Sequence, residues 1–142
     1  MAWKFPKKTE STMYVIFRIV IGLLFLMHGM QKFGWLGTIS PGSIEGAATA
    51  FGLPAWLMFL VALVEFLGGL GIALGLFTRL WAVLGLIDMV GAQIVDHLPV
   101  SILPIANRGE LSMLYLVSFL VIFAMGAGKC SLEKAIFKKE QL

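Results

Sequence analysis

The sequence predicts an all-α integral membrane protein, an antiparallel four-helix bundle with a short interfacial helix between spans one and two and with both termini in the cytoplasm. Of the 142 residues, 59% are hydrophobic and only 13% are charged, whereas an ordinary soluble domain carries roughly a quarter charged residues. The apolar residues fall into four runs near the length of about 20 residues that crosses a bilayer. A mean hydropathy of +0.93 with 16 glycines is typical of closely packed membrane helices. We therefore expect residues 1–142 to form one four-span domain.

Span one covers residues 13–30 and follows Lys4, Lys7 and Lys8. A basic segment before an apolar run resembles a signal peptide. We reject that interpretation because the run contains Arg18, and because the nearest small-x-small triplet lies about twenty residues beyond its end. We expect span one to stay in the protein as a membrane helix.

A connection rich in Gly, Ser and Pro joins spans one and two, with Trp35 near its start and Trp56 just after its end. Indole rings favour the boundary between the polar and apolar layers of a membrane, so both suit one membrane surface. Residues 43–51 follow a Ser-Pro-Gly turn signal and carry apolar side chains at helical spacing. We expect a short interfacial helix there.

Spans two and three cover residues 55–77 and 79–96 and are separated by the break at Thr78-Arg79, which forces an antiparallel helical hairpin. The uninterrupted apolar part of span three has about 16 residues, so this helix must sit upright, thin the bilayer or begin inside the turn. A polar connection then leads to span four, residues 110–126.

The basic residues are distributed unevenly between the two sides of the predicted bundle. Eight of the eleven lie in the tails, residues 1–12 and 127–142, or in the turn between spans two and three. Lys32 and Arg108 fall on the opposite side. This asymmetry predicts a multi-pass protein of the cell membrane with cytoplasmic N and C termini. It also explains the sequence pI of about 9.2 without nucleic acid as a partner.

Three ionisable residues, Arg18, Glu65 and Asp88, fall inside the spans. Each costs about 2.5 to 3.5 kcal/mol on insertion scales, so each needs a partner or a function. At about 1.5 Å per residue, Arg18 and Asp88 lie about 7 and about 12 Å above the cytoplasmic boundary, while Glu65 lies near the midplane with no basic residue at its own level. Asp88 is the nearer mate for Arg18, and a pair with Glu65 stays open. Glu65 either fixes helix packing, in an ion pair or as a hydrogen-bonded acid, or handles protons or binds a ligand, or faces water where the bilayer is thin.

Glycines on span two lie close to Glu65. Gly68 and Gly69 share its helical face, and a neighbouring face carries a second small-xxx-small step. We interpret these faces as helix contacts, with a flat ring ligand as the alternative. The predicted helix-packing residues are Gly22, Gly29, Gly68, Gly69, Gly71 and Gly75.

A second polar cluster is expected at the outer ends of spans one, three and four. Two histidines there could ligate a haem iron, or hold a metal ion with a carboxylate. The cluster could also bind a ligand head group with His28 as proton donor or acceptor, or simply face water. We favour the last two interpretations and predict no metal site, because the spacing is not diagnostic and His97 lies in a connection. The members of this cluster are His28, Lys32, Asp96, His97 and Glu110.

The sequence contains no motif for nucleotide binding, nucleophilic catalysis or dithiol redox chemistry. There is no Gly-rich phosphate loop, dinucleotide fingerprint or nucleophile triad. The single cysteine, Cys130, allows neither an internal disulfide nor a dithiol pair. No cofactor is therefore assigned with certainty, and any redox activity depends on a partner or a bound cofactor.

Several short motifs stand in a fixed order along the chain and together resemble the DoxX family from span one onward. The motifs are HGMQKFG at 28–34, VEFLGG at 64–69, GLFTR at 75–79, Gly109-Glu110, and GAGKCSLE at 126–133. The family's characteristic positions fall here on Arg18, His28, Gly29, Lys32, Glu65, Gly68, Gly69, Thr78, Arg79 and Glu110.

The resemblance implies a four-helix membrane protein related to the membrane subunits of thiosulfate:quinone oxidoreductase. Such a protein would be a membrane subunit of a redox complex that interacts with a quinone and works with a soluble or membrane-bound partner protein. One alternative is a non-catalytic anchor or assembly factor, and another is a path for a small solute or protons, which four helices provide only as a homo-oligomer. No residue is assigned as catalytic. The candidate ligand-binding or proton-handling residues are Arg18, His28, Lys32, Glu65, Asp88, His97 and Glu110.

Overall fold

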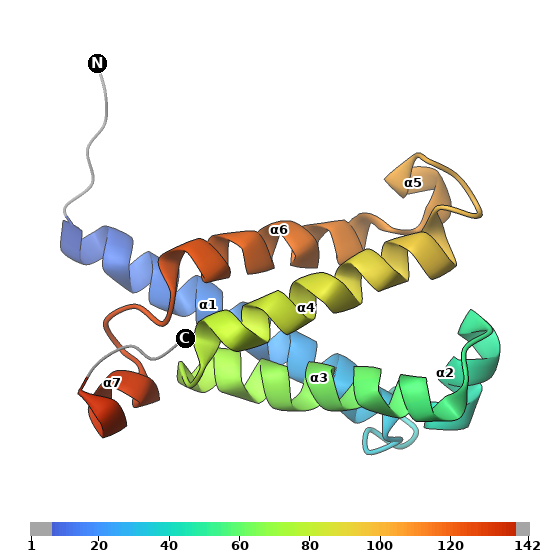
Figure 1. The fold of residues 1–142 in the computed structure, drawn as a ribbon, viewed down its shortest axis with the longest axis horizontal. Helices are drawn as coiled ribbons and strands as arrows, with labels where there is room; N and C mark the ends of the chain where they lie inside the picture. Colours follow the sequence, from blue (N-terminus) through green and yellow to red (C-terminus); the bar gives the residue numbers. More distant parts are fainter. Residues whose placement is uncertain (1–6, 139–142) are drawn as a thin grey trace.

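The computed structural model describes residues 7–138, and within that part of the chain every regular element is a helix (Figure 1). The portions of the predicted basic tails at positions 1–6 and 139–142 lie outside the described residues. The elements are α1 (Lys7–Lys32), α2 (Ile44–Phe51), α3 (Ala55–Leu74), α4 (Thr78–Ala92), the π-helical turn η1 (Gln93–His97), α5 (Pro104–Asn107), α6 (Glu110–Met125) and α7 (Leu132–Phe137).

The long helices α1, α3, α4 and α6 run back and forth between two ends of the molecule (Figure 1). α1 packs along α3, α3 and α4 form a hairpin, and α4 packs against α6, whereas α1 and α6 touch only slightly. α2 and α5 lie at one end, and the start of α1 and α7 lie at the other. We call these the α2 end and the α7 end.

Three helical segments are long and apolar enough to cross a membrane: Ser11–Lys32, Ala55–Leu74 and Thr78–His97. α6 is apolar but has only 16 residues. Of the alternatives expected for span three, a start inside the turn is confirmed, because α4 begins at Thr78, and the turn η1 extends this helix to a segment of 20 residues.

The turn between α3 and α4 comes earlier in the chain than predicted. Span two was expected to reach residue 77, but α3 ends at Leu74 and Gly75 caps it with φ 71°. Phe77, with φ 48°, precedes α4. Glycine adopts this left-handed conformation without a steric penalty, which makes it the usual residue after a helix. The helix therefore ends at the glycine and not at the Thr78-Arg79 break.

Glycines bring α1 and α3 into backbone contact. A Cβ atom added at Gly22 would lie 2.5 Å from the backbone nitrogen of Ala73, and one added at Gly29 would lie 2.5 Å from that of Phe66. Both distances are far below van der Waals contact, so only glycine fits at these two positions. These contacts fix the vertical register of α1 on α3, with residues 29–32 beside the region of Glu65 and Phe66.

The core is aromatic and aliphatic, and so is the outer surface. Phe25, Ile72 and Phe119 are 0% exposed, and the rings of Phe25 and Phe119 meet edge to face with centroids 4.8 Å apart. Large apolar side chains such as Ile87 and Leu114 are 64% and 65% exposed. An apolar exterior of this extent is typical of a surface that faces lipid.

The short helix predicted within residues 43–51 is confirmed as α2. Ser43 caps its first turn, accepting a hydrogen bond from the Gly46 N–H at 2.9 Å, and Gly52 ends the helix with φ 63°. A side-chain oxygen at this position satisfies one of the free N–H groups of the first turn. The two shorter helices α5 and α7, of 4 and 6 residues, were predicted as a polar connection and a tail.

Candidate functional site

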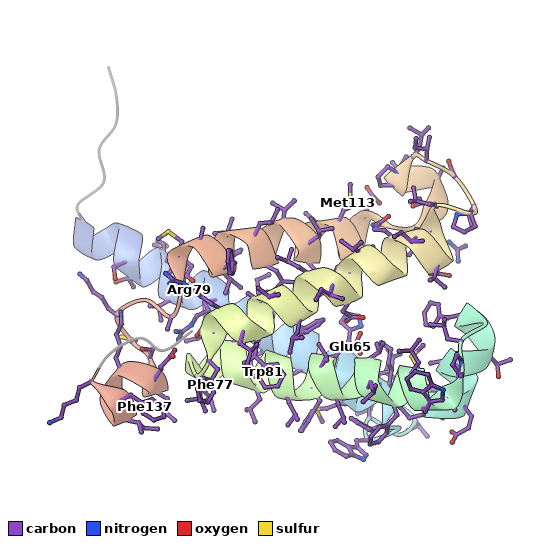
Figure 2. The ribbon with its side chains drawn as sticks, viewed as in Figure 1. Glu65, Phe77, Arg79, Trp81, Met113 and Phe137 are labelled. Carbon is purple, nitrogen blue, oxygen red and sulfur yellow. The ribbon has the colours of Figure 1, made fainter. Side chains whose placement is uncertain are left out.

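A buried ion pair joins α1 to α3 near the α2 end. Lys32 Nζ lies 2.7 Å from Oε1 and 2.6 Å from Oε2 of Glu65. The side chains of Lys32 and Glu65 are 15% and 5% exposed. Glu65 projects from α3 toward α4 (Figure 2). The expectation that Glu65 has no basic residue at its level is therefore wrong.

The reason lies in the packing of α1. Its helix continues two residues past the predicted end of span one, and Gly29 rests against Phe66. Helical side chains lean toward the N-terminus of their helix, so the long Lys32 side chain reaches down to Glu65. The contact between Lys32 and Glu65 could not be predicted by counting residues from the start of each span.

Arg18 pairs with neither of the carboxyls proposed for it. Its guanidinium is 1% exposed and donates to the carbonyl oxygens of Ala127, of Cys130 at 2.8 Å and of Ala73 at 3.4 Å. Arginine suits this position because its planar group offers several donors at once. Arg18 therefore fastens the segment after α6 to the α3–α4 turn at the α7 end.

A cavity of about 280 Å³ lies between α3 and α4, and we call it the α3–α4 cavity. Its walls are largely apolar, and Lys32, Glu65 and Asp88 form its polar part. Oδ2 of Asp88 is buried and has no hydrogen-bond partner among the described residues. A buried unpaired carboxyl oxygen costs free energy unless something satisfies it. A Cβ atom added at Gly91, also in the wall, meets nothing within 4 Å.

A second cavity, the inner pocket of about 210 Å³, lies between α1, α3, α4 and α6. It brings together His28, Glu65, Asp96 and His97 from the predicted clusters. The His28 and Tyr115 rings meet edge to face at 5.6 Å. Glu65 thus borders both the α3–α4 cavity and the inner pocket.

The outer cluster differs from the prediction in two members. Lys32 turns to Glu65, and Glu110 is exposed; neither lines the inner pocket, in which Arg108 takes part instead. His97 Nδ1 lies 3.1 Å from the carbonyl oxygen of Asn107 and 3.5 Å from Oδ2 of Asp96. Because a carbonyl oxygen only accepts, Nδ1 of His97 carries the hydrogen.

A third cavity of about 650 Å³, the vestibule, lies at the α2 end. Its walls come from the last turns of α1, the loop before α2, and α2 itself. His28 and Lys32 border it, and Phe51 borders all three cavities. Phe51, Tyr115 and Gly91 were not among the predicted site residues. The phenol of Tyr115, inside a largely apolar span, was a sequence signal that could have identified it.

Neither metal ligation nor a haem gains support from this geometry. Within residues 7–138, no group of three His, Cys, Asp or Glu side chains gathers to hold a metal ion. His28 and His97 line the same inner pocket, but its 210 Å³ is below the size of about 300 Å³ at which ligand pockets begin. The arrangement suits a small polar head group better than a macrocycle.

Comparison with known families identifies the chain. Residues 13–98 match the DoxX family model. The chain belongs to the DoxX family. This match includes the ion pair, Asp88 and both histidines of the DoxX chain described here.

Three relatives match the DoxX chain over most of their length. A Haemophilus influenzae protein is 36% identical over 86% of this chain and 89% of its own. The Bacillus subtilis protein named "Putative oxidoreductase CatD" is 31% identical over 87% of each chain. A Mycobacterium tuberculosis protein, "Uncharacterized membrane protein Rv3486", is 36% identical over 88% of this chain and 82% of its own. No solved structure gives a significant match.

Proposed function

We propose that α1, α3, α4 with η1, and α6 all cross the cell membrane as a four-helix bundle, with the α7 end in the cytoplasm. The uneven distribution of basic residues supports this orientation, as does the position of the start of α1 and of α7 at one end. α6, at about 1.5 Å per residue, spans about 24 Å, and slight local thinning of the bilayer accommodates the difference.

We propose further that this DoxX protein binds a quinone in the α3–α4 cavity. The observation that carries the proposal is the unpaired Oδ2 of Asp88, beside Lys32 and Glu65 in an otherwise apolar cavity. A quinone offers a flat apolar ring and two carbonyl oxygens that need donors. A protonated Asp88 or a free hydrogen of the Lys32 ammonium supplies such a donor.

The size and position of the cavity fit the head group of a lipid-soluble ligand. Its volume of about 280 Å³ is slightly below the size of about 300 Å³ at which ligand pockets begin, so it accommodates a head group and not a long tail. Ile87 and Val95 line the cavity and are also exposed on the outer surface. A tail that leaves the cavity between them would lie in lipid.

In this proposal, a partner protein carries out the redox step. The chain has one cysteine, so it forms no dithiol couple, and the reducing equivalents come from a second protein. The word oxidoreductase in the name of the Bacillus subtilis relative agrees with this proposal without specifying a substrate. We therefore infer a membrane subunit of a redox complex, which acts together with its partner.

A second candidate, an anchor for a partner protein, is favoured by the α7 end. Arg18 holds residues 127 and 130, and the rings of Phe77 and Phe137 lie near each other with centroids 6.1 Å apart (Figure 2). Ile136, also on α7, is 57% exposed. A C-terminal segment held in one conformation offers a partner protein a preformed binding surface. This role is compatible with quinone binding, because the two sites are at opposite ends.

Purification in mild detergent tests the ligand proposal. Organic extraction and mass spectrometry of the pure protein should find a quinone near one molecule per chain when it is expressed in a host that makes quinones. Lipid extracted in parallel from an unrelated four-span protein gives the background. Quinone at or below that background, together with no binding of an added short-chain quinone, would refute the proposal.

A further inference from the structure

The vestibule has the properties of a water-filled space. Its 650 Å³ equals the liquid volume of roughly twenty water molecules at about 30 Å³ each. His28, Gln31 and Lys32 provide polar groups in its wall, and Ser43 adds a hydroxyl from the loop before α2. Polar cavities of this size hold ordered water, whereas empty cavities are apolar.

The Lys32–Glu65 pair contributes a side chain to the wall of each of the three cavities. Lys32 borders the vestibule and the α3–α4 cavity. Glu65 borders the α3–α4 cavity and the inner pocket, and His28 borders the inner pocket and the vestibule. The Lys32 side chain, which contacts the Glu65 carboxyl group and borders the vestibule, therefore links this carboxyl group to the α2 end.

Toward the α7 end the path from Glu65 is filled by side chains. Phe25, Ile72 and Phe119 are 0% exposed and pack in one cluster. Gly22 brings α1 into backbone contact with α3, which leaves no width for water between these two helices. Arg18, 1% exposed, lies beyond this layer. Apolar packing at such density excludes water.

We propose that the vestibule is a half-channel that gives Glu65 proton access to the water at the α2 end and not to the water at the α7 end. A hydronium ion in the vestibule gives its proton to the Glu65 carboxylate, which becomes neutral while Lys32 stays charged, and the reverse step returns the proton to water. Nothing else is transferred. This proton access is a property separate from ligand binding. It rests on the proposed function only in one respect: the proton taken up by Glu65 would serve a ligand in the α3–α4 cavity.

Cysteine labelling tests the half-channel without any ligand. In a Cys130→Ser background, single cysteines replace Ala47 in the vestibule wall, His28 between the vestibule and the inner pocket, and Ile72 in the packed core. Right-side-out and inverted membrane vesicles receive a membrane-impermeant, positively charged methanethiosulfonate reagent. Mass spectrometry then measures the labelled fraction.

The proposal predicts a sharp limit between the second and third positions. Ala47→Cys and His28→Cys should be labelled from the same single side, and Ile72→Cys from neither. The matched control is Met27→Cys, which neighbours His28 but is 50% exposed on the outer surface and should stay unlabelled in lipid. In the protein that keeps its natural cysteine, Cys130 is exposed at the α7 end and should be labelled from the opposite side.

Two results would overturn the half-channel. One is a folded His28→Cys protein that the reagent does not reach although it labels Ala47→Cys. The other is labelling of Ile72→Cys from the side that labels Cys130. If gel filtration shows that His28→Cys does not fold, Gln31→Cys takes its place, since Gln31 lines the same wall. Neither result depends on the quinone content of the protein. The half-channel proposal and the quinone proposal can therefore be refuted independently.

Discussion

Lys32, the last residue of α1, and Glu65, in the middle of α3, form a two-contact ion pair with both N–O distances at or below 2.7 Å. The two residues are 33 positions apart in sequence, and at least one of them lines each of the three cavities. A buried charge that has lost its partner costs far more than the pair itself contributes. Stability and ligand binding should therefore respond differently to changes at these positions.

The first prediction concerns the stability of the ion pair. Lys32→Met leaves the Glu65 carboxylate without a partner and should destabilise the protein by about 3–5 kcal/mol. Lys32→Met with Glu65→Gln removes both charges and should recover more than half of that loss. Thermal unfolding of the three proteins in one detergent measures the difference. A double variant less stable than Lys32→Met would contradict the assignment.

The second prediction concerns the glycine contacts between α1 and α3. Gly22→Val and Gly29→Val place atoms against the backbone of Ala73 and Phe66 and should cost at least about 1–3 kcal/mol, the range for overpacking. Gly91→Ala is the control because its Cβ atom meets nothing within 4 Å. The midpoint temperature of unfolding should fall for both valine variants and stay within a degree or two for the control. Equal behaviour of all three variants would rule out backbone contact at Gly22 and Gly29.

The third prediction concerns Arg18. Arg18→Met removes the donors that hold the carbonyl oxygens of Ala127 and Cys130 and should release the segment after α6. Hydrogen exchange in residues 126–134 should accelerate at least tenfold, and Arg18→Lys should restore little, because a lysine ammonium lacks the planar fork. Quinone content should not change. An unchanged exchange rate would show that Arg18 does not fasten this segment.

Helix positions were largely predictable from the sequence, because apolar periodicity and turn residues are local signals. Residues 43–51 illustrate this, since the Ser-Pro-Gly signal marks the start of α2. The end of α3 was misplaced because an apolar run continues past Gly75, and capping glycines are ambiguous in a sequence rich in glycine. The π-helical turn at Gln93–His97 has no local sequence signal that distinguishes it from α-helix.

The partners of the buried charges were not predictable in the same way. Glu65 was correctly singled out as a buried carboxyl, but its pairing depends on the register that Gly22 and Gly29 impose on α1. Arg18 binds backbone carbonyl oxygens more than 100 residues away in the chain. Backbone acceptors are present at every residue, so no side-chain pattern identifies them.

The fourth prediction concerns the donor role of Asp88. Asp88→Asn keeps a hydrogen-bond donor of the same shape, whereas Asp88→Leu removes it from the cavity wall. The affinity for a short-chain quinone should stay within about threefold for asparagine and fall about tenfold for leucine, as expected for the loss of one buried hydrogen bond. Titration with tryptophan fluorescence or calorimetry measures both. Equal losses for the two variants would show that Asp88 acts by its charge and not as a donor.

Filling the α3–α4 cavity tests ligand binding there most directly. Gly91 lines the cavity, and a Cβ atom there meets nothing within 4 Å, so Gly91→Leu is designed to narrow the cavity, while Gly91→Ala adds a single methyl group to the same wall. We compare the quinone content per chain of both variants with that of the unaltered protein after identical purification. The account predicts bound quinone in the unaltered and alanine proteins and at least tenfold less in a folded leucine variant. Equal quinone content in a folded Gly91→Leu protein would contradict it.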